Sequence, residues 1–266
     1  MSVDRPARRI GGRRVGQSNV DVERFGRDGN QIGFHAERMP GRARPRQTPP
    51  AMTTILALDC ALEGLSVALW QDGVVVAQRA RGGRDQAATL FPELAALFAE
   101  TGIARNAVDL LAASRGPGSF TGVRAGLAAA RGLAIALERP LAGITTTDAL
   151  LEGAPAGAVA AIASGLGDWF CALAPGAAPF VADAAAFSNA AIVVGTGLAP
   201  LGGLRADGGP RELRAAGPLA PALAALAARR SVAEWRAENA SDGLPRPLYL
   251  RGASVTTATG ERRTVE

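Results

Sequence analysis

Asp59 is the first residue whose type and position suit chemistry, because it follows a run of apolar residues at 55–58. A carboxylate at a strand end suits a hard cation, and short donors in the following turn suit phosphate oxygens. That turn, residues 60–64, holds no hydroxyl, and the next one is on Ser66. A turn or capping role explains a lone strand-end Asp more simply, and we favour that role.

A glycine-rich segment at 115–124, RGPGSFTGVR, is the second candidate. It opens a helical pattern, with Ser119 and Thr121 as candidate N-caps. Free N–H groups and the helix dipole could bind an anion there, whereas the alternative is a tight strand-to-helix turn. The candidate anion or nucleotide residues are Asp59, Gly116, Gly118, Ser119, Thr121 and Arg124.

A Gly-Thr-Gly turn at 195–197 follows an apolar run and could lie against a nucleotide. An ordinary turn explains it better. Trp169 and Phe170 are interpreted as core or rim residues and not as a stacking platform for bases.

Several kinds of catalysis are excluded by residues that the sequence lacks. All 29 basic residues are Arg, which excludes a Lys Schiff base and a P-loop lysine. His35 is the one histidine, so histidine triads and multi-histidine metal sites are excluded too. Cys60 and Cys171 have no metal-ligand spacing, and we expect both to be buried and reduced.

Apolar runs and turn signals after residue 52 predict alternating strands and helices. Strands are expected at 54–59, 65–70, 74–79, 108–114, 141–144, 158–163, 169–173 and 191–194. Helices are expected at 85–100, from the glycine-rich loop to 138, from about 146, and at 218–230. A three-strand meander followed by crossover units is typical of the superfamily of actin-like ATPases, Hsp70 and sugar kinases. We therefore predict a ribonuclease H-like α/β fold with two lobes, the second reduced.

The chain divides by composition near residue 52. Residues 1–51 carry a net charge of +6 and residues 52–266 carry −1. We expect residues 1–51 to be a disordered Arg-rich extension, or else a mis-assigned start that precedes a true start at Met52. Lobes are expected at 52–153 and 154–217, with a helix at 218–231 packing back on the first and a frayed tail at 252–266. No membrane span is predicted, because the best candidate contains Arg124 and Arg131.

Two helices carry more apolar surface than one core contact needs, which favours a helix–helix partner surface. The alternative, that both apolar stripes belong to the chain's own core, is about equally good. The candidate interface residues are Leu90, Phe91, Leu94, Leu97, Phe98, Gly122, Gly126, Ala129 and Leu133.

Four segments closely resemble the TsaB family, formerly called YeaZ. They are ILALD at 55–59, SVAL at 66–69, GPGSFTGVR at 116–124 and PLYLR at 247–251, in the family's order. The resemblance runs from Met52 to about Arg251 and leaves out residues 1–51. GPGSFTGxR with its Gly/Ala helix is specific to the family, and the terminal P-x-Y-L-R agrees with it.

The resemblance implies a non-catalytic accessory subunit that forms a heterodimer with a catalytic paralogue, TsaD, joined by the ATPase TsaE. Together they transfer threonylcarbamoyl to N6 of the adenosine beside the anticodon in tRNA. The family's dimer surface is its first two helices, here 85–100 and 122–138. We expect Leu94→Asp or Gly126→Trp to break the complex and leave the fold intact.

A metal site is not expected in this chain. The catalytic paralogue carries a His-x-x-x-His pair, which holds a metal from one helix face; Thr146 and Leu150 stand at those positions here. The metal is therefore expected from the partner. The family's Asp-Thr-Ser is Asp59-Cys60-Ala61 here, so ATP or ADP is expected to bind weakly or only at the partner interface.

Other roles stay open on the sequence. One is a self-sufficient metallopeptidase-like or ATP-dependent enzyme of the same superfamily, and another is RNA binding through the Arg-rich front. For the accessory subunit, we expect a cytoplasmic protein without membrane contact that reaches tRNA only through the complex. A homodimer is an alternative when the partner is absent.

Overall fold

The computed structural model describes residues 52–203, 209–251, 253–256 and 262–265. The extension predicted at 1–51 lies outside the described residues. The described residues build two five-stranded sheets and one two-stranded sheet.

The first sheet is a meander extended by parallel strands, as the sequence predicts. Its strand order is β3-β2-β1-β4-β5, antiparallel from β3 to β1 and parallel from β1 to β5. Asp72 and Gly73 turn the β2–β3 hairpin with φ of +43° and +95°, which the Asp-Gly signal predicts. The strands are β1 (Thr54–Asp59), β2 (Leu65–Gln71), β3 (Val74–Arg81), β4 (Leu110–Ser114) and β5 (Leu141–Ile144).

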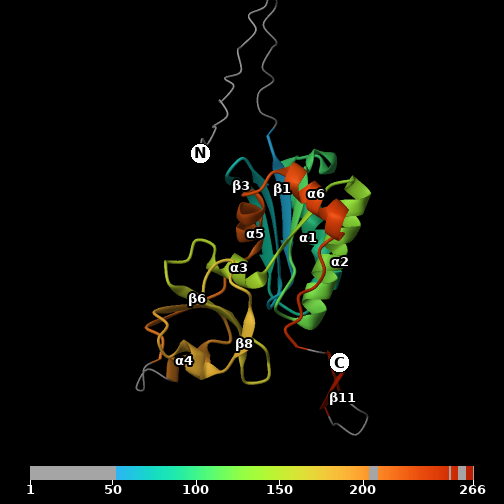
Figure 1. Ribbon diagram of the computed structural model, residues 1–266. Helices are drawn as coiled ribbons and strands as arrows, with labels where there is room; N and C mark the ends of the chain where they lie inside the picture. Colours follow the sequence, from blue (N-terminus) through green and yellow to red (C-terminus); the bar gives the residue numbers. More distant parts are fainter. Residues whose placement is uncertain (1–51, 204–208, 252, 257–261, 266) are drawn as a thin grey trace, which may run out of the picture. The chain divides into compact units, whose positions relative to one another are not determined.

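Successive side chains of each strand point to opposite faces of this sheet, so they contribute to two separate apolar layers. Leu56 and Leu58 pack beneath α1 (Gln86–Thr101) and α2 (Phe120–Leu137), whereas Ile55 and Ala57 pack beneath α5 (Ala220–Ala227). Figure 1 shows α1 and α2 on one side of the sheet and α5 on the other. A short turn of 3-10 helix, η1 (Arg105–Ala107), precedes β4.

The second sheet repeats the topology of the first in smaller form. Its order is β8-β7-β6-β9-β10, antiparallel from β8 to β6 and parallel from β6 to β10, as in the first sheet. Its crossovers hold only the short helices η2 (Ala184–Phe187) and α4 (Ala199–Gly202) where the first sheet has α1 and α2. This confirms the two-lobed fold with a reduced second lobe. Its strands are β6 (Ala158–Ala163), β7 (Trp169–Ala172), β8 (Phe180–Ala182), β9 (Ile192–Thr196) and β10 (Glu212–Ala215); α3 (Thr146–Leu151) joins the sheets.

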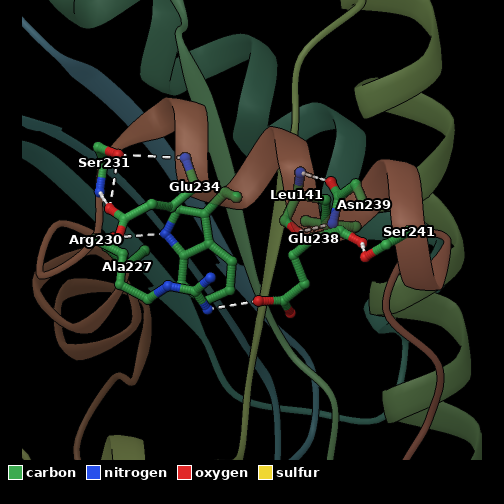
Figure 2. Close-up of polar contacts among 9 residues, drawn as sticks. Leu141, Ala227, Arg230, Ser231, Glu234, Glu238, Asn239 and Ser241 are labelled. Carbon is green, nitrogen blue, oxygen red and sulfur yellow. Dashed lines mark hydrogen bonds and ion pairs between the residues drawn. The ribbon is translucent and has the colours of Figure 1, made fainter.

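A helix that the sequence did not predict, α6 (Val232–Asp242), covers the β5 edge of the first sheet. Trp235 is its one buried residue, so the helix has no apolar stripe by which the sequence could predict it. It starts with a capping box between Ser231 and Glu234. Figure 2 shows Asn239 facing Leu141: its Oδ1 accepts from the Leu141 N–H at 2.7 Å, and its Nδ2 donates to the Leu141 carbonyl at 3.1 Å. Asn239 thus acts as one more strand residue and closes the edge.

Replacing Asn239 by alanine is expected to lower the free energy of unfolding by about 1–3 kcal/mol, because both backbone groups of Leu141 lose their partners. Ser241→Ala is the matched control, since its hydroxyl donates only to Glu238 within the same helix, and it should cost less than about 0.5 kcal/mol. Urea unfolding followed by circular dichroism measures both values. Equal effects of the two substitutions would show that Asn239 does not close the edge.

The described part of the C-terminal segment forms a hairpin. Where a frayed tail is predicted, β11 (Ala253–Thr256) and β12 (Arg262–Val265) pair as an antiparallel hairpin. Both strands contain β-branched residues, which favour pairing over fraying.

Among the described helices, α2 is long and apolar enough to cross a membrane by length and composition alone. It packs on β4 and α1, as a core helix of an α/β protein does.

Candidate functional site

A cleft of about 710 Å³ lies where the β1–β2 hairpin meets the end of β9, a size that suits a small ligand. Asp59, Glu63 and Arg81 supply its charged side chains, and the turn at 195–197 supplies its far wall. None of the residues 116–124 lines it. Of the predicted anion or nucleotide set, Asp59 therefore lines this cleft, and part of the 116–124 segment packs nearby against the turn that follows Asp59.

Asp59 is largely buried, and one of its two carboxylate oxygens is engaged within the fold. Its carboxylate is 4% exposed, and one oxygen accepts hydrogen bonds from Ser114 Oγ at 2.5 Å and from the Ala61 N–H at 2.9 Å. Burial raises the pKa of Asp59, while the hydrogen bonds from Ser114 and Ala61 partly offset that rise. The capping role favoured by the sequence fits this geometry.

Ser66, the nearest hydroxyl of this hairpin, is also engaged. Its Oγ accepts from the N–H groups of Leu219 and Ala220 at 3.1 and 3.0 Å, so it caps the start of α5. Both groups that could have met a metal-bound phosphate from this hairpin are therefore used to hold the fold together.

The turn at 195–197 is explained by close strand packing. Gly195 has φ of +156°, and a Cβ there would lie 1.6 Å from the Ala161 carbonyl oxygen of β6. Trp169 is 4% exposed and donates through Nε1 to the Gly197 carbonyl at 3.2 Å, which confirms it as a core residue. Only a glycine fits position 195, whatever occupies the cleft.

Asp59→Asn is expected to raise the free energy of unfolding at pH 7. The amide oxygen can keep both hydrogen bonds, and the variant avoids a buried charge. An acid whose folded-state pKa is raised costs stability above that pKa, and the cost fades as pH falls toward the unfolded-state value of about 4. The advantage of the variant should therefore shrink as the pH is lowered. Urea unfolding across this range tests it, and a variant less stable than the wild type at pH 7 would contradict it.

Two backbone N–H groups at the start of α2 donate to acceptors within the chain. The Ser119 N–H donates to the Ala61 carbonyl at 2.7 Å, and the Gly122 N–H donates to Ser119 Oγ, so Ser119 is the N-cap. Gly116 is buried, and its carbonyl accepts from the Thr146 N–H. Thr121 is exposed and is not the cap. An anion at this helix start, as the sequence suggested, would compete with these bonds for the N–H groups of Ser119 and Gly122.

The small face of α2 contacts its own chain and not a partner helix. A Cβ on Gly122 would lie 2.0 Å from the Cys60 carbonyl oxygen, and one on Gly118 would lie 2.3 Å from that of Ala61. Gly126 faces the Cys60 side chain, with 3.1 Å from its Cβ position to Cys60 Cβ. The predicted interface role of Gly122 and Gly126 is therefore corrected: glycine is needed so that the β1–β2 turn can pack on the helix.

Most of the other predicted interface residues also belong to the core, which decides an alternative that the sequence left even. Leu90, Leu94 and Leu97 are at most 4% exposed beneath the first sheet, so their predicted interface role is wrong. Phe98, Ala129 and Leu133 are partly buried against the same cluster. Phe91 is the member that faces solvent, with 53% of its surface exposed.

A different apolar surface, which we call the outer stripe, runs along the solvent side of α1 and α2. Phe91 and Ile135, 70% exposed, are its large residues, and its other members are alanine, glycine and proline. Arg131 is also exposed on this side of α2, next to Ala128 and Ile135. An exposed apolar patch with a polar edge of this kind is a mark of an interaction surface. Sequence reasoning missed all but Phe91, because alanine and glycine carry little hydropathy signal. The outer stripe comprises Ala88, Phe91, Pro92, Ala95, Ala99, Ala128, Gly132, Ile135 and Ala136.

The positions that correspond to the catalytic paralogue's histidine pair hold two buried residues. Thr146 is fully buried at the start of α3 and Leu150 is 5% exposed, so both fill the core beneath the second sheet. Within the described ranges, no three His, Cys, Asp or Glu side chains gather closely enough to hold a metal ion.

Two sheets of one repeated strand order, with a cleft beside the first hairpin, define an actin-like, ribonuclease H-like α/β protein. A family model described as "TsaD: tRNA N6-adenosine threonylcarbamoyltransferase" matches residues 76–173. Two solved structures match 75% of this chain and 100% of their own. One is a Pseudomonas aeruginosa protein "with similarity to peptidase YEAZ" (TM-score 0.61, 32% identity), and the other is "YeaZ from Pseudomonas aeruginosa" (TM-score 0.58, 31% identity).

The chain belongs to the TsaB family, also called YeaZ. A curated relative, the "tRNA threonylcarbamoyladenosine biosynthesis protein TsaB" of Escherichia coli (strain K12), is 41% identical over 100 residues. The match covers 38% of this chain and 43% of that relative, so the chain spans less than half of the relative's length.

Proposed function

We propose that this protein is the non-catalytic accessory subunit of a complex that transfers threonylcarbamoyl to N6 of the adenosine beside the anticodon in tRNA. Membership of the TsaB family supports this proposal, together with the relative's role in tRNA threonylcarbamoyladenosine biosynthesis. The single observation that carries it is the outer stripe, a solvent-exposed apolar face on the two helices that the family uses for dimerisation.

The stripe would dock the catalytic paralogue TsaD. An apolar face of this kind loses water when a complementary helix pair covers it, and Phe91 and Ile135 would act as its anchors. The TsaD-type family model matches 76–173, so the two partners would meet through related helices. TsaE would join this pair, tRNA would bind through the complex, and a homodimer is the alternative when TsaD is absent. We place the complex in the cytoplasm.

Chemistry is assigned to the partner. Thr146 and Leu150, buried where the catalytic paralogue carries its histidine pair, are poor ligands, so the metal would come from TsaD. The engagement of Asp59 and Ser66 within the fold favours weak binding of ATP or ADP to the isolated chain. Calorimetry with magnesium and ATP is expected to show no micromolar binding, and a micromolar dissociation constant would contradict this.

Reconstitution of the transfer reaction tests the proposal. Threonylcarbamoylation of a cognate tRNA, with threonylcarbamoyl-adenylate as the donor and AMP as the leaving group, is compared for this chain alone, for TsaD with TsaE, and for all three proteins. Product only in the complete mixture is expected. Product from this chain alone would favour the competing function, a self-sufficient enzyme, and full activity of TsaD with TsaE alone would remove the accessory role.

A further inference from the structure

Residues 245–251 follow α6 and form an extended segment, here called the strap, which crosses from the first lobe to the second. Its start is fixed by close packing and backbone bonds. A Cβ on Gly143 of β5 would lie 2.5 Å from Pro245 Cβ, so only glycine leaves room for the strap. The Leu248 N–H donates to the Arg115 carbonyl at 2.7 Å, which binds the strap to the loop after β4.

The middle of the strap grips the first turns of α2. Arg124 Nε donates to Tyr249 Oη at 2.6 Å, and the Arg124 guanidinium carbon lies 3.7 Å from the centre of the Phe120 ring. The Phe120 and Tyr249 rings lie 5.7 Å apart, with the guanidinium stacked near both. Cation–π contacts of this kind are modest when they are exposed, as these rings are.

The end of the strap reaches the second lobe through one ion pair. Arg251 donates to Asp168 in the turn between β6 and β7, and Asp168 also accepts from Ser164 Oγ. The two charged side chains are 33% and 23% exposed, so water screens the pair only in part. The strap is thus attached to β5 at its start, to α2 in its middle and to the second sheet at its end.

We propose that the strap is a releasable clamp between the lobes and that the Arg251–Asp168 pair is its latch. The backbone passes between the sheets in two places, from β5 into α3 and from β10 into α5, and α3 and α5 contact each other. A buried apolar cluster continues through these helices and forms a hinge. The strap is a third link, and within the described residues the Arg251–Asp168 side-chain pair holds it to the second lobe. Breaking the latch would let the second lobe move about the hinge and would loosen Tyr249 on α2, two residues away.

The distance between the lobes is the direct measurement of this clamp. Spin labels on Ala99→Cys in α1 and Ala186→Cys in η2, both at exposed positions, report it by pulsed electron resonance in the full chain. The native cysteines will not react under mild labelling, because both are buried, and burial raises the pKa of Cys60 to about 12 and that of Cys171 to about 11. Circular dichroism of each variant shows that it is folded.

Arg251→Ala and Asp168→Asn are each expected to broaden the distance distribution and shift its mean. Arg214→Ala is the matched control: it removes an Arg–carboxylate pair that lies wholly within β10, and it should leave the distribution unchanged. The exchanged pair, Arg251→Asp with Asp168→Arg, should restore a narrow distribution, because it rebuilds the pair in reverse.

Three results would overturn the clamp. The first is a distribution in Arg251→Ala that equals that of the wild type. The second is equal broadening by Arg214→Ala. The third is broadening in both latch variants that the exchanged pair does not reverse, which would assign the motion to lost local packing.

Discussion

The double substitution Phe91→Asp and Ile135→Asp is expected to abolish binding to TsaD while leaving this chain folded. Both side chains are more than half exposed on the outer stripe, so two carboxylates there cost the free chain about 0.5 kcal/mol each at most. In the complex the same charges would have to be buried without partners, which costs several kcal/mol and lowers the affinity at least 100-fold. Gel filtration with TsaD measures the loss of co-elution, and thermal melting measures the fold.

Two controls separate docking from folding. Leu173→Asp places the same charge on an exposed apolar residue after β7 in the second lobe and should leave co-elution intact. Leu94→Asp, which the sequence suggested as a docking probe, should instead unfold the chain, because Leu94 is 4% exposed in the core. Unchanged co-elution of the double variant would show that the outer stripe is not the docking surface.

Gly122→Ala is expected to destabilise the chain by about 3 kcal/mol or more, a large effect for a single methyl group. Its Cβ would lie 2.0 Å from the Cys60 carbonyl oxygen, and backbone on both sides prevents relief by a side-chain movement. The β1–β2 turn would have to leave the helix, and with it the bond from the Ser119 N–H to Ala61 would break. Chemical unfolding of the variant gives the value.

Gly132→Ala in the same helix is the matched control and should raise the free energy of unfolding instead of lowering it. Nothing lies within 4 Å of its Cβ position, so the alanine adds helix propensity worth about 0.5–1 kcal/mol without a clash. The changes in free energy of unfolding caused by Gly122→Ala and Gly132→Ala should therefore differ by about 4 kcal/mol, although both replace glycine by alanine in the same helix. Similar effects at both positions would contradict the close approach of the turn to α2.

The same contrast explains why the small face of α2 was wrongly assigned to a partner. Gly122 and Gly126 recur at helical spacing, and such a stripe allows close approach by any backbone. The periodicity indicates that another backbone packs closely on this face of α2. Only the folded chain shows that this backbone is the turn at 60–61. Leu90, Leu94 and Leu97 were misassigned in the same way, since amphipathic spacing cannot say which of two apolar stripes meets the sheet.

The sequence by itself determined the strands of the first sheet, the Asp-Gly hairpin, the helices α1 and α2, the actin-like topology and the family, because these depend on local periodicity, turn chemistry and a contiguous motif. It did not reveal α6, which has one buried residue and is held by Asn239 on Leu141. Only the tertiary structure decided which helix face stays in solvent, that Asp59 and Ser66 are spent inside the fold, and that the strap joins Arg251 to Asp168. These properties arise between residues as many as 154 positions apart, where spacing along the chain carries no signal.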